Sequence, residues 1–475
     1  MRSLLLDALY AVGLAATSPI WLYRMVRHGR YRGDIAQQFG ASPIRYGLQP
    51  VIWVCGVSVG EIKAAKALVA GLHEQLPDYR VAVSSWTDTG MAEARRLFAP
   101  DHLVFRRPLD FSFAVSRSLD RLHPGLVVLV EGDLWPNFLA ACNERGIPVV
   151  LVNARVSPDK GYPGYKRMGY LAGEMLFNRL AAIGAQDEAY AQRLRELGAD
   201  GERVTVTGMM KFDSVEVADR LDGQEALAEA MGLSDADRLI VAGGTGPGEE
   251  GILLDVFGRL RQRHRNVRLA IVPRKPERFD EVARLITSRG FALLRRSKRP
   301  DGTISPSPPD AVILGDTMGE LRKFYALACC IFVGRSLAPM GGSDMIEAAA
   351  LGKATAFGPH TFNFPQADDL ARNGCTRVAD AAALEKQLDR WLADPSAAAE
   401  AGQAAGQYVR RQQGATRRNV ELVCRVLGRV PNPGGIATDI IEHDAPGGWG
   451  SPQRSSAAGS SCAPGQAARG AGPEG

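Results

Sequence analysis

The feature that most constrains the fold is a repeated alternation of short apolar runs with longer amphipathic stretches. The first run, VIWVC at 51–55, is followed by a glycine-containing turn and by EIKAAKALVAGL, in which apolar residues recur at helical spacing. The same unit recurs through further runs at 81–85, 103–105, 126–130 and 148–152. Such runs are typical of parallel strands covered by helices on both faces, so the pattern predicts a doubly wound α/β domain.

A second series of apolar runs follows the first after a polar, helix-prone stretch. These runs lie at 239–244, 267–273, 311–314, 330–334 and 354–357. Two such series predict two Rossmann-like, doubly wound domains. We place the first domain at 33–213, a linker or interdomain helix at 214–236 and the second domain at 237–430.

The N-terminus is apolar over about the length that crosses a bilayer. The stretch 4–23 is interrupted by Asp7 and Pro19, and a basic cluster follows it directly. This cluster comprises Arg24, Arg27, His28, Arg30 and Arg32. Positive charges beside an apolar segment are held at the anionic cytoplasmic face, so residues 1–32 are predicted to anchor a cytoplasmic body to a membrane. The alternative is an amphipathic first helix that only docks on the folded body.

The C-terminal segment differs in composition from the rest of the chain. Residues 431–475 are rich in Gly, Pro, Ala and Ser and hold too few large apolar groups to offset ordering entropy, so we expect a disordered tail. Over all 475 residues, 57 Lys and Arg against 52 Asp and Glu give a net charge of +5, which disfavours a nucleic acid partner. The seven scattered cysteines lack CxxC spacing, which predicts neither disulfides nor structural zinc.

Glu61 is the first candidate for chemistry. In open α/β sheets the ligand binds beyond the carboxyl ends of the strands, and Glu61 follows the run 51–55 through a short turn. There its carboxylate could act as a general base. The alternative is a first-turn glutamate that complements the helix dipole.

Glu131 and Asp133 come directly after the apolar run 126–130. A carboxylate at the end of a buried strand is costly unless it is paired or useful, so both are candidates for the site. The alternative is that Asp133 caps a helix beginning at Leu134 while Glu131 pairs with a neighbouring base.

Basic residues follow a strand of the second series. Arg274, Lys275 and Arg278 come after the run 267–273, where their charges can neutralise a phosphate. The alternative is a solvated basic turn. A glycine-rich turn at 243–250 precedes a helix and also suits an anion, although it matches neither GxGxxG nor the P-loop pattern.

Two more segments of the second series are candidates. Thr317, Met318 and Gly319 stand at the start of a predicted helix whose free N–H groups could meet a phosphate; the alternative is simple helix initiation. Glu347, in the segment 341–353, would project from the first turns of a helix within reach of a ribose diol. The histidines are isolated and no metal-ligand spacing appears, so we expect no metal site.

Eight short segments then combine into a recognisable set. They are SVGE (58–61), DLWPN (133–137), VVLVNARVS (149–157), RVTVTGMMKFD (203–213), VPRKPERF (272–279), GDTMGEL (315–321), FVGRSLAPMGG (332–342) and FGPHTFNF (357–364). In this order they resemble the 3-deoxy-D-manno-octulosonic acid (Kdo) transferases of lipopolysaccharide assembly, from the N-terminal anchor to about Leu427. The resemblance implies a GT-B glycosyltransferase whose N-terminal acceptor domain and C-terminal CMP-Kdo domain face a central cleft.

The resemblance also implies roles for individual residues. Glu61 is implied as the general base toward the acceptor hydroxyl, and Glu131 and Lys211 as groups that stabilise the transition state. The implied contacts with CMP are Pro273, Arg274, Met318, Gly319, Glu320, Asp344, Met345, Ile346 and Glu347. The implied reaction is an inverting, metal-independent transfer of Kdo from CMP-Kdo to a lipid A precursor (lipid IVA) at the cytoplasmic face of the inner membrane.

The sequence departs from the family pattern near the predicted donor site. EGDLWPN stands where ETELWPN is usual, the segment 244–246 (Gly-Thr-Gly) replaces Ser-Thr-His, and Ser343 and Asp344 replace a His-Asn pair. Arg335 replaces a glycine and could supply a compensating positive charge. These changes leave two alternatives: a related GT-B transferase with another donor or acceptor, and a non-enzymatic scaffold. Retention of the charged catalytic positions argues against the scaffold.

Overall fold

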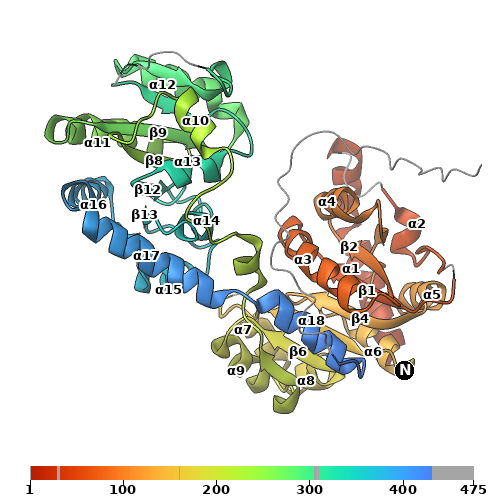
Figure 1. Ribbon diagram of the computed structural model, residues 1–475. Coiled ribbons are helices and arrows are strands. Elements are labelled where there is room, and N and C mark those ends of the chain that lie inside the picture. Colours follow the sequence, from red (N-terminus) through yellow and green to blue (C-terminus); the bar gives the residue numbers. More distant parts are fainter. Residues whose placement is uncertain are drawn as a thin grey trace, which may run out of the picture. The chain divides into compact units, whose positions relative to one another are not determined.

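The computed structural model describes residues 2–28, 33–45, 47–159, 161–303, 308 and 310–430 (Figure 1). By their contacts all of these residues fall within one compact unit. The chain begins with the long helix α1 (Arg2–His28) and the short helix α2 (Ile35–Gln38). The predicted disordered tail, 431–475, lies outside the described residues.

The first sheet contains seven parallel strands in the order β3-β2-β1-β4-β5-β6-β7. The strands are β1 (Val51–Gly56), β2 (Arg80–Ser85), β3 (Leu103–Arg106), β4 (Pro124–Val130), β5 (Val149–Ala154), β6 (Ala182–Ala185) and β7 (Val204–Val206). The five predicted apolar runs are confirmed as β1 to β5, within two residues at each end. The strands β6 and β7 were not predicted from the sequence.

The helices around this sheet follow the alternation of side chains along its strands. In β1, Trp53 faces one hydrophobic core and its neighbours Ile52 and Val54 face the other, as a pleated strand requires. One face is covered by α3 (Val59–Gln75), α4 (Asp88–Phe98) and α18 (Ala415–Val426). The other is covered by α5 (Ser112–Leu122), α6 (Pro136–Glu144), α8 (Tyr170–Met175) and α9 (Glu188–Glu196), and α7 (Tyr162–Met168) packs at its edge.

The second sheet repeats this plan with seven parallel strands in the order β10-β11-β9-β8-β12-β13-β14. Its strands are β8 (Arg238–Thr245), β9 (Val267–Pro273), β10 (Leu293–Arg295), β11 (Val312–Leu314), β12 (Cys330–Val333), β13 (Ala354–Phe357) and β14 (Thr376–Arg377). The five predicted runs are confirmed here too. The short strands β10 and β14 were not predicted.

Helices cover both faces of the second sheet as well. One face packs against α10 (Gln224–Ala230), α13 (Leu321–Leu327), α14 (Ile346–Ala349), α15 (Ala367–Arg372) and α17 (Pro395–Gln412). The other packs against α11 (Glu249–Arg263), α12 (Phe279–Ser288) and α16 (Ala381–Ala393). The two layered sheets confirm the prediction of two Rossmann-like domains.

The structure differs from the predicted domain boundaries in two places. Within the predicted linker, 214–236, the helix α10 buries Leu227 and Ala230 in the core of the second sheet. The last helix among the described residues, α18, falls in the predicted second domain but packs on the first sheet, beside α3 (Figure 1). The stretch 214–236 was predicted as a linker or interdomain helix, and no helix was predicted at 415–426. Helical periodicity carries no information about which sheet receives the apolar face.

Polar contacts fix α18 in this position. The carboxylate of Asp213 accepts hydrogen bonds from the backbone N–H of Gly414, at 2.6 Å, and of Thr416, at 2.5 Å, at the start of the helix. Further along the helix, Asn419 accepts a hydrogen bond from the hydroxyl of Thr207 at 3.1 Å. A Cβ on Gly184 in β6 would lie 2.4 Å from Asn419 Oδ1, so the approach of α18 requires glycine at that position.

Each sheet has one point at which the order of its strands reverses. In the first sheet the chain runs outward from β1 to β3 and returns beside β1 at β4; in the second it runs outward from β8 and returns beside β8 at β12. In doubly wound folds the ligand binds beyond the carboxyl ends of the strands at such a point. The segments after β1 and β4, and those after β8 and β12, are therefore where functional side chains are expected.

Candidate functional site

Glu61 lies on the first turn of α3, directly after β1. Its backbone N–H donates to the hydroxyl of Ser58 at 3.3 Å, and its carboxylate accepts from Ser58 Oγ at 3.0 Å and from the Val57 N–H at 2.6 Å. This arrangement is a capping box, so Glu61 does stabilise the first turn of its helix, as the alternative to a catalytic role requires. Burial nevertheless raises the pKa of Glu61 above the usual range, although these hydrogen bonds oppose the shift. A carboxylate in this position can cap the helix and, when deprotonated, still act as a base.

Glu131 follows β4 on the other side of the strand reversal. Its backbone has a φ of 70°, which is unusual for a residue with a side chain. Burial raises the pKa of Glu131, and the charge of Glu61 raises it further, while Arg155 and Lys211 oppose the shift. Glu131 makes no ion pair with any residue that the structure describes; instead its Oε1 accepts a long hydrogen bond of 3.4 Å from Asn153 Nδ2. The two predicted catalytic carboxylates therefore lie within each other's electrostatic influence.

Asp133 does not cap a helix, contrary to one alternative considered from the sequence. The helix α6 begins at Pro136, not at Leu134, and its N-cap residue Trp135 makes no side-chain cap. The carboxylate of Asp133 instead pairs with the buried Arg107 and accepts from Trp135 Nε1 at 2.5 Å. Because proline is favoured in the first turn of a helix, Pro136 shifts the start of α6 beyond Asp133.

Asn153 is a site residue that the sequence reasoning missed. It is the last residue but one of β5, is 2% exposed and has a φ of 53°. Its Nδ2 donates to Glu131, and its Oδ1 accepts from the backbone N–H of Met210 at 3.1 Å. A polar residue that tolerates positive φ at the end of the run VVLVN was the available signal. Asn153 thus links Glu131 to the turn that carries Lys211.

Lys211 lies in the short 3₁₀ turn Met210–Ser214. Its Nζ is 2.8 Å from Asp344 Oδ2 and 4.4 Å from the centre of the Phe364 ring. Both partners come from segments around the second sheet. The structure therefore joins a predicted catalytic residue to the predicted donor segment 344–347.

The donor segment contains one strongly perturbed carboxylate. Burial raises the pKa of Glu347 to about 7, and the charge of Asp344 adds to this effect, whereas Arg322, Arg274 and Lys211 oppose it. The side chains of Met345 and Ile346 are fully buried in the second core. Of the four residues predicted in this segment, only Asp344 and Glu347 can therefore offer a side chain to a ligand.

The two arginines of the basic segment after β9, Arg274 and Arg278, have different roles. Pro273 ends the strand, and Arg274 is exposed, with its backbone N–H bonded to Thr245 O at 3.1 Å. Arg278 instead pairs with the buried Glu250 and with Glu281. Arg278 is therefore a structural residue, and Arg274 is left as the arginine of this segment that is available to a phosphate.

The segment 315–321 also differs in detail from its prediction. The helix α13 begins at Leu321, with Glu320 rather than Thr317 at its N-cap. Glu320 accepts hydrogen bonds from Arg296 at 2.7 and 2.9 Å, so its carboxylate is already engaged. Met318 is 71% exposed, and Gly319 has a φ of 86° that favours glycine.

The glycine-rich turn after β8 is occupied by the protein's own carboxylate. Glu249 is fully buried and accepts from the backbone N–H groups of Gly246 (3.0 Å), Arg335 (2.5 Å), Ser336 (2.8 Å) and Leu337 (3.0 Å). These amides cannot also serve an external anion. The prediction of an anion site at the turn is therefore wrong for Gly246, and Glu249 instead fixes the loop after β12.

The residues that depart from the family pattern lie close to one another. Ser343 Oγ donates to Gly244 O at 2.7 Å. Arg335, whose φ is 58°, donates through Nη2 to Met340 O at 3.2 Å. A Cβ on Gly246 would lie 2.6 Å from Met340 Sδ. The compensating charge suggested for Arg335 stays a prediction.

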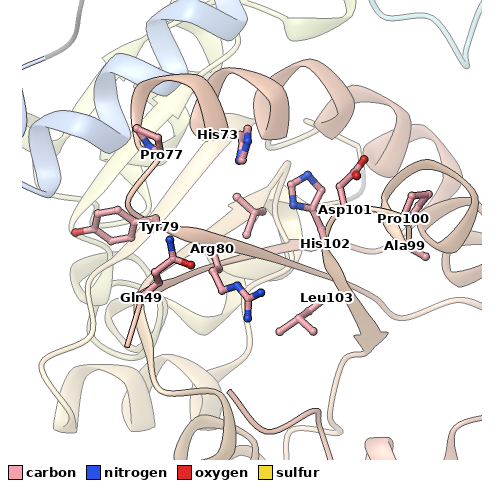
Figure 2. A pocket seen from close by; sticks show the side chains of 11 residues that line it. Gln49, His73, Pro77, Tyr79, Arg80, Ala99, Pro100, Asp101, His102 and Leu103 are labelled. Atoms are coloured by element: carbon pink, nitrogen blue, oxygen red, sulfur yellow. The ribbon is translucent and has the colours of Figure 1, made fainter. Parts of the chain in front are cut away.

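A cavity of about 330 Å³ lies elsewhere, at the amino ends of the first strands (Figure 2). Its walls include His73, Tyr79, Arg80, Asp101 and His102. Burial and the neighbouring His73 lower the pKa of His102. None of the predicted site residues lines this cavity. It lies at the amino ends of the strands, whereas Glu61 and Glu131 follow the carboxyl ends of β1 and β4. Among the residues described, no group of three potential ligands could hold a metal ion.

The fold is that of the GT-B class. A putative UDP-N-acetylglucosamine 2-epimerase from Listeria monocytogenes superposes with a TM-score of 0.53 at 13% identity, covering 80% of this chain and 97% of the other. A glycosyltransferase from Rickettsia africae superposes with a TM-score of 0.52 at 14% identity, covering 81% and 100%. At such low identity these likenesses establish the fold alone.

Sequence comparison identifies the family. Residues 32–214 match the model described as 3-deoxy-D-manno-octulosonic-acid transferase (kdotransferase). The 3-deoxy-D-manno-octulosonic acid transferase of Bordetella pertussis is 35% identical, covering 88% of this chain and 99% of the relative. That of Haemophilus influenzae is 31% identical, covering 85% and 94%. The chain belongs to the Kdo transferase family and is a glycosyltransferase, as the motifs predicted.

Proposed function

We propose that this protein transfers Kdo from CMP-Kdo to the lipid A precursor lipid IVA, with inversion at the anomeric carbon and without a metal ion. One observation carries the proposal: Glu61 and Glu131 flank the strand reversal of the first sheet, and Lys211, which influences Glu131, reaches Asp344 at the second. Carboxylates that can act on an acceptor hydroxyl are thus connected, through Lys211, to the segment whose cations can offset the charge of a departing phosphate.

The proposed reaction is a single displacement. Glu61 takes the proton from the acceptor hydroxyl while that oxygen bonds to the anomeric carbon of Kdo. The bond from the same carbon to the phosphate oxygen breaks, and its electron pair leaves with CMP. One displacement inverts the configuration. Glu131, held by Asn153, orients the acceptor or favours positive charge on the sugar ring.

Two cations support departure without a metal ion. The ammonium of Lys211 and the exposed guanidinium of Arg274 both influence Glu347 and therefore lie around the same segment. Charges placed in advance where negative charge develops stabilise the transition state. CMP carries one phosphate, which these side chains can meet.

The central test is a transfer assay on the full-length chain. Wild type with CMP-Kdo and a tetra-acylated disaccharide acceptor is expected to form Kdo-modified lipid in the presence of EDTA, with the inverted anomer seen by NMR. Activity that EDTA abolishes and Mg²⁺ restores would contradict the metal-independent mechanism. No product from folded protein would favour the alternative of another donor or acceptor, which a panel of nucleotide sugars would then identify.

We further propose that α1 holds the protein on the cytoplasmic face of the inner membrane. Within the described residues, one segment, Ser3–Arg27 of α1, is long and apolar enough to cross a membrane by length and composition. Asp7 Oδ1 accepts from the Ser112 N–H at 2.8 Å and from Asn137 Nδ2 at 3.0 Å, and the Tyr10 hydroxyl donates to Asp110 at 3.1 Å. These polar contacts hold the first half of α1 on the body, which favours an interfacial helix over a spanning one.

The apolar residues of α1 supply the test of this placement. Leu4, Leu5, Leu9, Val12 and Val26 are exposed. The double change Leu9→Glu and Val12→Glu is expected to move most of the protein from the membrane fraction to the supernatant, because charged groups are costly in the apolar interface. Leu171→Glu, at an exposed leucine on α8, serves as the control. Membrane binding that survives the double change would contradict the role of α1.

A further inference from the structure

Asp344 uses its two carboxylate oxygens for different purposes. Its Oδ1 accepts from the backbone N–H of Ile346 at 3.0 Å, which holds the side chain at the start of α14. Its Oδ2 lies 2.8 Å from Lys211 Nζ. The local hydrogen bond fixes the carboxylate, and the fixed carboxylate in turn holds the ammonium.

The ammonium of Lys211 has a second neighbour. It lies 4.4 Å from the centre of the Phe364 ring, a distance at which a cation is attracted to the ring face. About a third of the side chain of Lys211, and a little less of that of Asp344, is exposed. The pair is therefore reachable by a ligand from solvent.

Cations outnumber carboxylates around the pair. Asp344 and Glu347 supply the carboxylates of the cluster, and Lys211, Arg274 and Arg322 supply its cations. Asp344 disfavours ionisation of Glu347, so its negative charge is felt across the cluster. A phosphate can meet Arg274 directly, but to contact Lys211 it must outcompete Asp344.

From these contacts we infer that Asp344 competes with the phosphate of the donor nucleotide for Lys211 and so sets donor affinity. This inference rests on the proposed function, since it takes CMP as the nucleotide. The Lys211 ammonium is paired with Asp344 before the nucleotide binds. On binding, the phosphate replaces the carboxylate, and Asp344 becomes an unpaired charge beside it. The energy lost in that exchange weakens binding.

The substitution Asp344→Asn isolates this effect. The amide oxygen of Asn can still accept from the Ile346 N–H, so the local turn is kept, but the negative charge is removed. Coulomb's law at the effective dielectric constant of a half-exposed site gives roughly a 3- to 10-fold lower Kd for CMP at low salt. Asp255→Asn provides a matched control, because Asp255 is an exposed aspartate of α11, on the other face of the second sheet, and pairs with Arg289.

Two measurements on the full-length protein test the inference. Calorimetric titration with CMP gives the Kd of wild type, Asp344→Asn and Asp255→Asn. Reductive methylation followed by mass spectrometry gives the reactivity of Lys211 without nucleotide. We expect tighter CMP binding and faster methylation of Lys211 in Asp344→Asn, with both quantities unchanged in Asp255→Asn.

The other outcomes separate the inference from the proposed function. If Asp344→Asn binds CMP as well as wild type does, or more weakly, the inference is overturned while CMP binding by wild type keeps the donor assignment. If none of the three proteins binds CMP, the donor assignment fails, and the competition fails with it even if Lys211 becomes more reactive. Unchanged reactivity of Lys211 in Asp344→Asn overturns the ion pair itself.

Discussion

Replacing Glu61 by Gln is expected to lower kcat for Kdo transfer by about 10²- to 10⁴-fold, the usual range for loss of a general base. Glutamine keeps the size of the side chain; its oxygen can accept from the Val57 N–H while its amide N–H donates to the Ser58 hydroxyl, so the start of α3 is preserved. What it lacks is a basic oxygen for the acceptor proton. Initial rates with saturating donor and acceptor measure the change.

Ser58→Ala distinguishes catalysis by Glu61 from its role in the capping box. This change removes the hydroxyl that accepts from the Glu61 N–H, which costs about 1 kcal/mol of stability, but it leaves the carboxylate in place. We expect a lower Tm with kcat within a few-fold of wild type. A loss of kcat in Ser58→Ala as large as that in Glu61→Gln would show that the helix cap, and not the base, limits the reaction.

The pH dependence of the reaction follows from the same carboxylate. Burial raises the pKa of Glu61, and the group is a base only when deprotonated. Therefore kcat/KM is expected to rise with pH through this raised pKa, with its acid limb above the usual pKa of a glutamate, about 4.3. Glu61→Gln is expected to lack that limb in its residual activity.

Replacing Lys211 by Met is expected to lower kcat by about 10²- to 10³-fold, the range seen when one preorganised donor to a developing negative charge is removed. Methionine keeps the length and the contact with Phe364 but cannot offset charge on the departing phosphate. Lys211→Arg, which restores a cation with another shape, is expected to recover part of the loss.

Lys386→Met is the matched control for Lys211→Met, since Lys386 is an exposed lysine on α16. It is expected to leave kcat unchanged. Measuring KM for CMP-Kdo beside kcat assigns the effect: a rise in KM alone would place Lys211 in ground-state binding and contradict its role in the transition state.

The strands that could be predicted from the sequence are the long apolar ones. Runs such as 126–130 carry enough buried apolar surface to be distinctive, and they were confirmed within two residues. The missed strands β6, β7, β10 and β14 have two to four residues and include Gly184, Thr205 and Arg295. They are strands because a neighbouring strand offers free backbone groups, which is a property of the assembled sheet.

The same division applies to the site. Glu61 and Glu131 could be predicted as site candidates because each follows a strand directly, and ligands bind beyond the carboxyl ends of the strands in such sheets. Asn153 and Glu249 could not, since their roles depend on the N–H groups of Met210, Ser336 and Leu337, which lie at least 57 residues away in the sequence. The pairing of Lys211 with Asp344 likewise depends on folding across 133 residues.

The packing of α18 on the first sheet has a consequence for synthesis of the chain. A ribosome completes the strands of the first sheet by Val206, yet the helix that covers part of one face begins at Ala415. While the intervening chain emerges, the side chains that later contact α18 have no permanent cover. One face of the nascent first domain is therefore incomplete until α18, the last helix in the described part of the chain, has been synthesised.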